Sequence, residues 1–211
     1  GIGEVLASHA EGIAVGERLY GFFPMASHVV MEPGESSEKG FADAMPHRSE
    51  LPGLYNYYAR TKSESVQLQA LEDQRCIFFP LFMTGYVIAD LLLDNDWFGV
   101  KQVVIGSASS KTGFSTAAFI RAAGFEGTLV GLTSDQNVAF SEALGCYDRV
   151  VRYVEVESIA SEPSTYIDIA GDVAVRSRLH HSLQNKVAQT LLVGATHWDQ
   201  FGQSVGGEPL P

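Results

Sequence analysis

From about residue 81 onward, short β-branched runs alternate with amphipathic helical patterns, and this alternation constrains the fold more than any other feature of the sequence. Strands joined by helical crossovers form a parallel sheet with right-handed connections. We therefore expect an α/β fold whose ligands bind at the carboxyl ends of the strands. The expected strands are 103–105, 128–132, 149–153, 166–170 and 190–193, and the expected helices are 82–93, 113–123, 137–144 and 173–183.

The chain before residue 76 has a different pattern. Residues 1–33 contain short strand-like runs separated by glycine turns, with one further strand expected at 27–31. Residues 34–50 mix charged residues with Ser, Gly and Pro, and residues 51–75 begin with a tyrosine cluster and continue polar. We expect 34–75 to connect the first part to a nucleotide-binding domain at 76–211. Because the chain starts with Gly1 and ends in a Gly- and Pro-rich tail, we expect a fragment of a longer protein.

Charge, apolar runs and cysteine content indicate which binding partners and which cellular compartment to expect. A formal net charge of −11 disfavours nucleic acid and anionic membrane surfaces as partners. The longest uninterrupted apolar run, 76–83, is too short to cross a bilayer. The two cysteines, Cys76 and Cys146, are far apart in sequence, which favours a reducing cytoplasm over a disulfide framework.

The segment 103–113 is the strongest candidate for a binding site. A run of small residues between a strand and a helix presents free backbone N–H groups and the positive end of a helix dipole to a phosphate. Side chains at 109–112 add three hydroxyls and one ammonium group. The alternative is that a serine only caps the helix. The residues concerned are Ser109, Ser110, Lys111, Thr112 and Gly113.

Two known phosphate-binding patterns can be compared with this turn. A P-loop would need glycine at Ile105 and Ser110, although Lys111-Thr112 fits its last two positions. The dinucleotide pattern G-x-G-x-x-G keeps only Gly113. The second strand ends in Thr133-Ser134, with no carboxylate before Asp135, so NADP(H) is favoured over NAD(H).

Several segments, in order, resemble the medium-chain dehydrogenase/reductase superfamily, and especially its zinc-independent quinone-oxidoreductase-like members. The segment 12–21 is similar to that superfamily's V-G-D-R-V-x-G turn, and 131–145 to its second strand and helix. Its third, fourth and fifth strands correspond to 148–153, 168–171 and 192–194. The turn 109–112 and the segment 51–56 resemble a branch with no assigned substrate.

The resemblance implies a Rossmann doubly wound sheet preceded by part of a GroES-like β-barrel at 1–33. It implies diphosphate binding at 109–113 and a homodimer. The adenosine 2′-phosphate would lie near Ser134 and Tyr153, and the nicotinamide near Gly171, Gly194 and Ala195. The chain departs from the family where Ser107, Ser110 and Lys111 replace glycines, and where Asn137 replaces a phosphate-binding lysine.

Catalytic groups are less well marked. The six histidines lack metal-binding spacing, and the superfamily's four-cysteine zinc loop is absent, so we expect no metal. Tyr55, Asn56 and Tyr58 are candidates for proton delivery, because a phenol can protonate an enolate. The alternative is that these tyrosines only pack, with their hydroxyls satisfied.

The sequence thus predicts an NADP(H)-dependent oxidoreductase that transfers hydride to a small carbonyl, enone or quinone without zinc. Two other functions stay open. One is a non-catalytic dinucleotide-binding or scaffold protein of the same fold, and the other is an NTP-binding protein that uses Lys111-Thr112.

Overall fold

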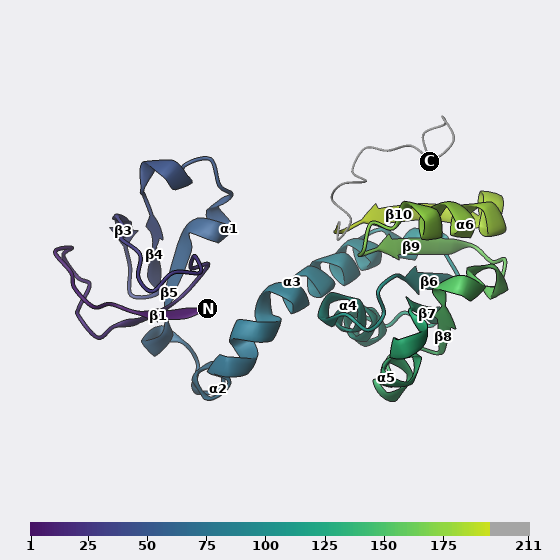
Figure 1. Ribbon diagram of the computed structural model, residues 1–211, viewed down its shortest axis with the longest axis horizontal. Coiled ribbons are helices and arrows are strands. Elements are labelled where there is room, and N and C mark those ends of the chain that lie inside the picture. Colours follow the sequence, from purple (N-terminus) through teal and green to yellow (C-terminus); the bar gives the residue numbers. More distant parts are fainter. Residues whose placement is uncertain (195–211) are drawn as a thin grey trace. The chain divides into compact units, whose positions relative to one another are not determined.

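The computed structural model describes residues 1–194, which form two compact units (Figure 1). Unit 1 is Gly1–Phe79, and unit 2 begins at Pro80. The boundary falls inside a single helix, α3 (Glu72–Asp94). Each unit has its own sheet and its own hydrophobic core, so each is described by itself.

Unit 1 is built on a five-stranded antiparallel sheet with the order β1-β2-β5-β4-β3. Its core contains Ile13, Leu19, Phe41 and Tyr58. The strands are β1 (Ile2–Glu4), β2 (Arg18–Tyr20), β3 (Pro33–Ser36), β4 (Gly40–Asp43) and β5 (Tyr57–Arg60). Helix α1 (Gly53–Asn56) precedes β5, and α2 (Val66–Ala70) follows it.

The sheet differs from the sequence-based expectation in two places. The segment 34–75 was expected to be a connection, yet it supplies most of β3 and all of β4 and β5. The strand expected at 27–31 is irregular, because among the described residues no neighbouring strand pairs with this run. Strands of three or four residues carry too little alternation to be recognised from sequence.

A buried ion pair at Arg60 joins β5 to the segment before β2 and to β3. Arg60 binds both carboxylate oxygens of Glu17, at 2.5 and 2.6 Å, and also donates to the carbonyl of Gly12 and the hydroxyl of Ser36. Lys62 lies 2.8 Å from the same carboxylate. Burial raises the pKa of Glu17, but the bonds from Lys62 and Arg60 outweigh burial and lower it. Glu17 is therefore held as a carboxylate.

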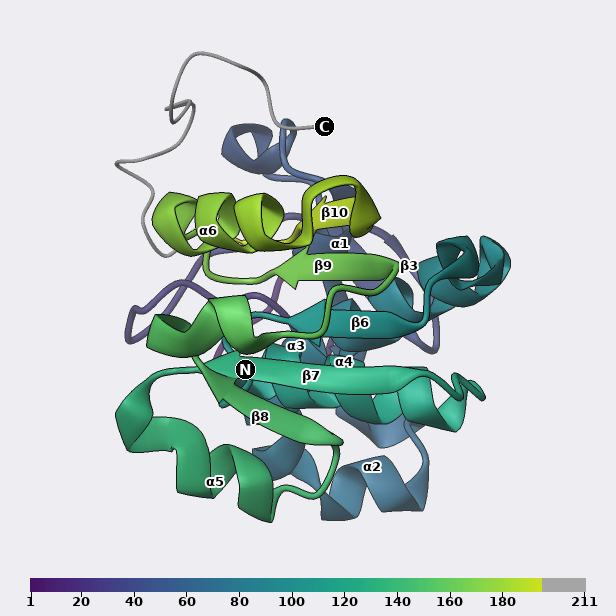
Figure 2. The ribbon, with the colours of Figure 1, turned by 90° about the vertical axis from the view of Figure 1, so that its right-hand side faces the viewer.

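Unit 2 contains the parallel sheet that the sequence predicted. The strand order β10-β9-β6-β7-β8 places the first strand of the unit, β6, in the centre, which is the Rossmann doubly wound order (Figure 2). All four strand pairs are parallel. The strands are β6 (Gln102–Ile105), β7 (Thr128–Thr133), β8 (Arg149–Arg152), β9 (Ser164–Asp168) and β10 (Val187–Leu192), and the helices after α3 are α4 (Lys111–Ala122), α5 (Val138–Ala143) and α6 (Val173–Leu183).

Helices cover both faces of this sheet. On one face, Leu92 of α3 and Ile120 of α4 are fully buried in the same core as Val103 and Ile105. On the other face, α6 and the 3₁₀ segment Tyr153–Ser158 share a second core with β7 and β8. A Cβ at Gly85 would lie 2.5 Å from Ser115 Oγ, so glycine permits the close approach of α3 to α4.

Helix α3 is longer than the sequence indicated. It continues through Pro80 and is the one described helix long and apolar enough to cross a membrane, by length and composition. Only 22% of its most apolar window is buried. The sequence-based expectation concerned only the uninterrupted run 76–83, and the helix extends beyond this run at both ends. The part of α3 that contains Ile88, Ala89 and Leu92 packs into the core of unit 2.

Candidate nucleotide-binding site

The turn between β6 and α4 keeps the backbone path of a glycine turn although it contains serine. Ser107 has φ of 52°, in the left-handed region that favours glycine. Three bonds hold it there. Its N–H donates to the Tyr153 hydroxyl at 3.0 Å, its Oγ lies 3.4 Å from the same hydroxyl, and its carbonyl accepts from Ser110 N–H at 2.8 Å. The side chain of Tyr153 therefore stabilises a conformation that serine alone disfavours.

Gly113 is required by packing. A Cβ at this position would lie 2.5 Å from the carbonyl oxygen of Ser107 and 3.1 Å from Ser110 Oγ. The third glycine of a dinucleotide fingerprint has this same role, which is close packing of the first helix on the first strand. Gly113, the one glycine of the dinucleotide pattern that this chain retains, therefore stands where no side chain fits.

A second tyrosine, Tyr147, also fixes the turn. The Tyr147 hydroxyl donates to the carbonyl of Ala108 at 2.9 Å, and the Ala108 N–H donates to Leu132 O at 2.9 Å. A Cβ at Gly131 would lie 2.8 Å from Ala108 Cβ and 3.0 Å from the Tyr147 ring. Burial raises the pKa of Tyr147 well above its ordinary value, so its hydroxyl stays protonated and remains a donor.

The first turn of α4 has both satisfied and unsatisfied N–H groups. Ser110 is the N-cap, and its hydroxyl accepts from Gly113 N–H at 3.0 Å. Within residues 1–194, the N–H groups of Ser109, Lys111 and Thr112 have no hydrogen-bond acceptor. The Lys111 side chain is exposed, and no described carboxylate lies within 4.0 Å of its ammonium group. Three unsatisfied N–H groups and an unpaired cation at a helix start can bind an anion.

The predicted residues of β7 and β8 lie beside this turn. The Thr133 hydroxyl is 3.4 Å from Ser109 Oγ, so the end of β7 reaches the phosphate turn. Ser134 is half-buried and accepts from the Asn137 side chain at 3.1 Å. Tyr153 follows β8 and contacts Ser107 as described above. The structure therefore brings these residues together at the carboxyl edge of the sheet.

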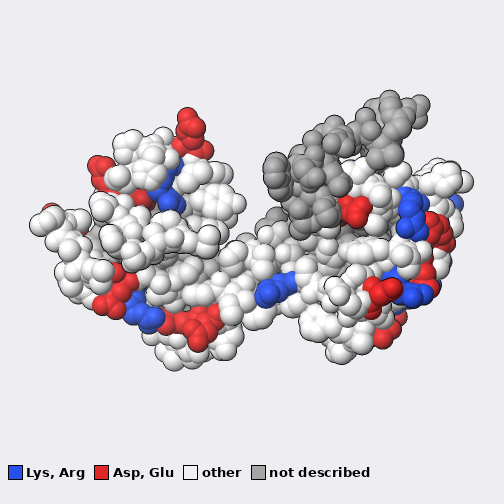
Figure 3. Space-filling model, in the orientation of Figure 1, with Lys and Arg blue, Asp and Glu red and all other residues white. Residues whose placement is uncertain are grey.

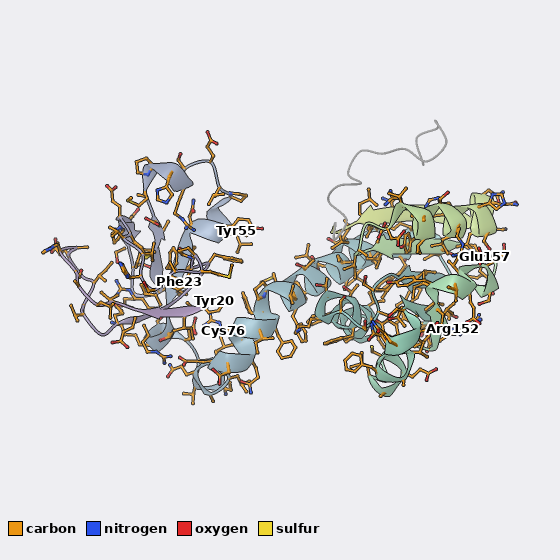
Figure 4. The ribbon with its side chains drawn as sticks, viewed as in Figure 1. Tyr20, Phe23, Tyr55, Cys76, Arg152 and Glu157 are labelled. Carbon is orange, nitrogen blue, oxygen red and sulfur yellow. The ribbon has the colours of Figure 1, made fainter. Side chains whose placement is uncertain are left out.

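Arg152, the last residue of β8, is a charged group at this edge that sequence reasoning missed (Figure 4). Its guanidinium hydrogen bonds both carboxylate oxygens of Glu155, with Nε 2.9 Å from Oε2, and Nη1 lies 3.4 Å from Asp135. The bond to Glu155 raises the pKa of Arg152 and lowers the pKa of Glu155. Figure 3 shows acidic and basic side chains intermixed over unit 2, as these pairs require.

Asp168 organises the loop after β9 and was also missed. It is fully buried at the end of the strand, where it binds Arg176 at 2.7 Å and accepts from Gly171 N–H at 2.8 Å. Gly171 has φ of 71°, which requires a residue tolerant of the left-handed region. The next loop approaches closely, because a Cβ at Gly194 would lie 2.5 Å from Ile169 O. The predicted Ala195 lies outside the described residues.

The three candidates for proton delivery all belong to unit 1. Tyr58 is fully buried, burial raises its pKa, and its hydroxyl donates to Phe22 O at 2.9 Å. Asn56 is buried and exchanges hydrogen bonds with Arg48 at 3.1 and 2.9 Å. Tyr55 is 41% exposed, and no described residue hydrogen bonds its hydroxyl. Asn56 and Tyr58 therefore have structural partners, and Tyr55 keeps an accessible hydroxyl.

No group of three or more His, Cys, Asp or Glu residues within the described part of the chain could hold a metal ion. His180 is buried on α6 and hydrogen bonds the Thr190 side chain at 2.9 Å. Burial lowers the pKa of His180, which favours the neutral ring. The expectation of a zinc-independent protein stays a prediction.

A doubly wound parallel sheet, with a small-residue turn between its first strand and first helix, defines unit 2 as a Rossmann domain. The chain belongs to the family described as "Protein of unknown function (DUF2855)", whose model matches residues 1–208. No curated protein matches the chain.

Three solved structures that are similar to this chain are described as oxidoreductases or dehydrogenases. A quinone oxidoreductase from Coxiella burnetii is 18% identical with a TM-score of 0.42, over 92% of this chain and 60% of that one. The yhdH oxidoreductase from Salmonella enterica in complex with NADP is 14% identical with a TM-score of 0.45, over 88% and 52%. The D-arabinose dehydrogenase from Sulfolobus solfataricus is 14% identical with a TM-score of 0.48, over 94% and 67%. The chain thus spans about half to two thirds of these structures.

Proposed function

We propose that this chain carries the nucleotide-binding domain of an NADP(H)-dependent oxidoreductase that reduces a small carbonyl, enone or quinone without zinc. The observation that carries the proposal is the turn before α4. It combines a strained Ser107, an irreplaceable Gly113 and three unsatisfied N–H groups at a helix start. The cofactor would supply the hydride, and the protein would supply binding and position.

In this proposal the diphosphate is held by the N–H groups of Ser109, Lys111 and Thr112, with the Lys111 ammonium group adding charge. The Ser110 hydroxyl is already used as the helix cap, so its role is to keep the turn open. Lys111 stands where related turns have glycine, and its exposed side chain supports a direct contact with phosphate.

The other contacts follow the order of the strands. Thr133, Ser134 and Tyr153 lie at the ends of β7 and β8, where a Rossmann domain holds the adenosine ribose. The loops that contain Gly171 and Gly194 follow β9 and β10, and their tight backbone supports close approach of the nicotinamide. Ala195 is part of the proposal by sequence alone.

Proton delivery is assigned to Tyr55, whose hydroxyl is accessible and has no partner among the described residues. A homodimer in the cytoplasm completes the proposal. The full activity belongs to the whole protein, since the chain covers only part of the length of the oxidoreductase structures to which it is similar.

Nucleotide titration with the purified protein tests this function. NADPH, NADH and a fluorescent ATP analogue are added separately, and binding is followed by fluorescence. Micromolar NADPH binding is the expected result. Binding of ATP alone would instead favour an NTP-binding protein, and binding of none would favour a scaffold.

Two lysine variants sharpen the test. Lys111→Ala removes the charge beside the helix start, and we expect NADPH affinity to fall about 10- to 100-fold. Lys101→Ala is the control, because Lys101 is also exposed but precedes β6 at the amino edge of the sheet. Equal NADPH affinity of both variants and the wild type would refute the phosphate role of Lys111.

A further inference from the structure

The position of Arg152 suggests a role beyond the ion pairs that it makes. In the register between β7 and β8, Arg152 is the direct partner of Thr133. Paired residues of a parallel ladder lie on neighbouring strands about 4.8 Å apart. Thr133 in turn contacts Ser109 of the phosphate turn, and Tyr153, the next residue after Arg152, contacts Ser107. Two direct neighbours of Arg152, its strand partner Thr133 and the next residue Tyr153, therefore both contact the phosphate turn.

The partners of Arg152 are replaceable. Asp135 and Glu155 are exposed, and exposed ion pairs contribute little to stability. Both carboxylates lie beside residues of the site, Asp135 after Ser134 and Glu155 two residues after Tyr153. They hold the planar guanidinium at the end of β8 while leaving its charge available to a stronger anion.

Two other arginines, on α6 and on β8 itself, have different partners. Arg178 of α6 binds the Glu157 carboxylate and the backbone carbonyls of Tyr153 and Val154, so it anchors the segment that follows β8. Arg149, at the opposite end of β8, binds the carbonyl and the hydroxyl of Ser158. Of the three, Arg152 alone is paired only with exposed carboxylates.

We infer that Arg152 selects NADP(H) over NAD(H) by binding the 2′-phosphate in place of Asp135 and Glu155. This inference rests on the proposed function. A 2′-phosphate offers several charged acceptors to the guanidinium fork, whereas the 2′-hydroxyl of NAD(H) cannot compete with two carboxylates. An arginine near the end of the second strand is a known way of accommodating this phosphate. Asp135 and Glu155 are then competitors of the ligand rather than part of its site.

This arrangement predicts opposite effects for the two sides of the ion pair. Arg152→Ala should weaken NADPH binding about 10- to 100-fold and leave NADH binding nearly unchanged. Glu155→Gln should strengthen NADPH binding a few-fold, because a competing charge is removed. A purely structural role of the pair would make both variants weaker binders.

The experiment is fluorescence titration of NADPH and NADH with the wild type, both variants and Arg149→Ala. Arg149→Ala removes a cation from the same strand, and we expect its affinities to equal those of the wild type. The inference is overturned alone if the wild type binds NADH as tightly as NADPH, or if Arg152→Ala changes both affinities equally or neither. A wild type that binds neither nucleotide overturns the proposed function and this inference together.

Discussion

Gly113→Ala is the substitution whose effect the structure defines most closely. Within a helix, alanine is favoured over glycine by about 1 kcal/mol, so propensity alone predicts stabilisation. The added Cβ, however, would lie 2.5 Å from the Ser107 carbonyl oxygen, well inside the 3.4 Å at which ordinary contacts begin. Forcing extra volume into a packed site costs about 1–3 kcal/mol. Because the clashing atom belongs to the backbone and cannot rotate away, the upper part of this range, about 2–3 kcal/mol, applies. We therefore expect a net loss of about 1–2 kcal/mol in the free energy of unfolding.

Thermal denaturation and NADPH titration measure the two consequences of this change. For a chain of this length the loss corresponds to a Tm lower by about 2–8 °C. NADPH affinity should fall by more than about 10-fold, because the clash displaces the turn that presents the N–H groups. Gly53→Ala is the control, since Gly53 also lies in the first turn of a helix and its Cβ would meet nothing within 4 Å. A Gly113→Ala protein that is as stable and binds as well as the Gly53→Ala protein would refute the packing argument.

Two further predictions concern stability. Ser107→Gly should keep or raise Tm, because glycine removes about 1 kcal/mol of left-handed strain at φ 52°. A Ser107→Val protein should melt at a lower temperature. A marked fall in the Tm of the glycine variant would contradict the strain. Glu17→Gln should lower the free energy of unfolding by about 3–5 kcal/mol, because it leaves the buried Arg60 without its counter-charge. Since the pKa of Glu17 is lowered in the folded state, its stabilisation is present above the unfolded pKa and is lost as the pH falls through the folded pKa. Urea titrations from neutral to acid pH should show this loss of stability in the wild type and not in Glu17→Gln. If the free energy of unfolding of both proteins fell in parallel with pH, the stabilising role of the Glu17 carboxylate would be refuted.

The parallel sheet was predictable because its signals are local. Residues of β6 are buried on both faces and form a β-branched run, and Gly124 and Gly145 end the helical patterns that follow. Apart from α3, which begins ten residues before the expected start, the predicted strands and helices of unit 2 agree with the structure within a few residues. The five-stranded order confirms the expected fold class. The turn 106–110 was located from small residues alone.

The pairs that organise the site edge could not be predicted from sequence. Arg152 meets Asp135 and Asp168 meets Arg176 only because the fold brings the ends of strands and helices together. The roles of Asn56 and Tyr58 were equally inaccessible, since their partners Arg48 and Phe22 are set by the sheet of unit 1. Tyrosine clustering predicts packing and catalysis equally well until the neighbours of each hydroxyl are known.

Amide chemical shifts of the α4 start, recorded by ¹H–¹⁵N NMR during addition of NADPH, test the central claim most directly. We predict large shifts for the N–H groups of Ser109, Lys111 and Thr112, which have no acceptor within the described residues, and smaller ones for Ser110 and Gly113, which are already hydrogen bonded. Saturating NADPH that leaves the first three signals in place would contradict the account.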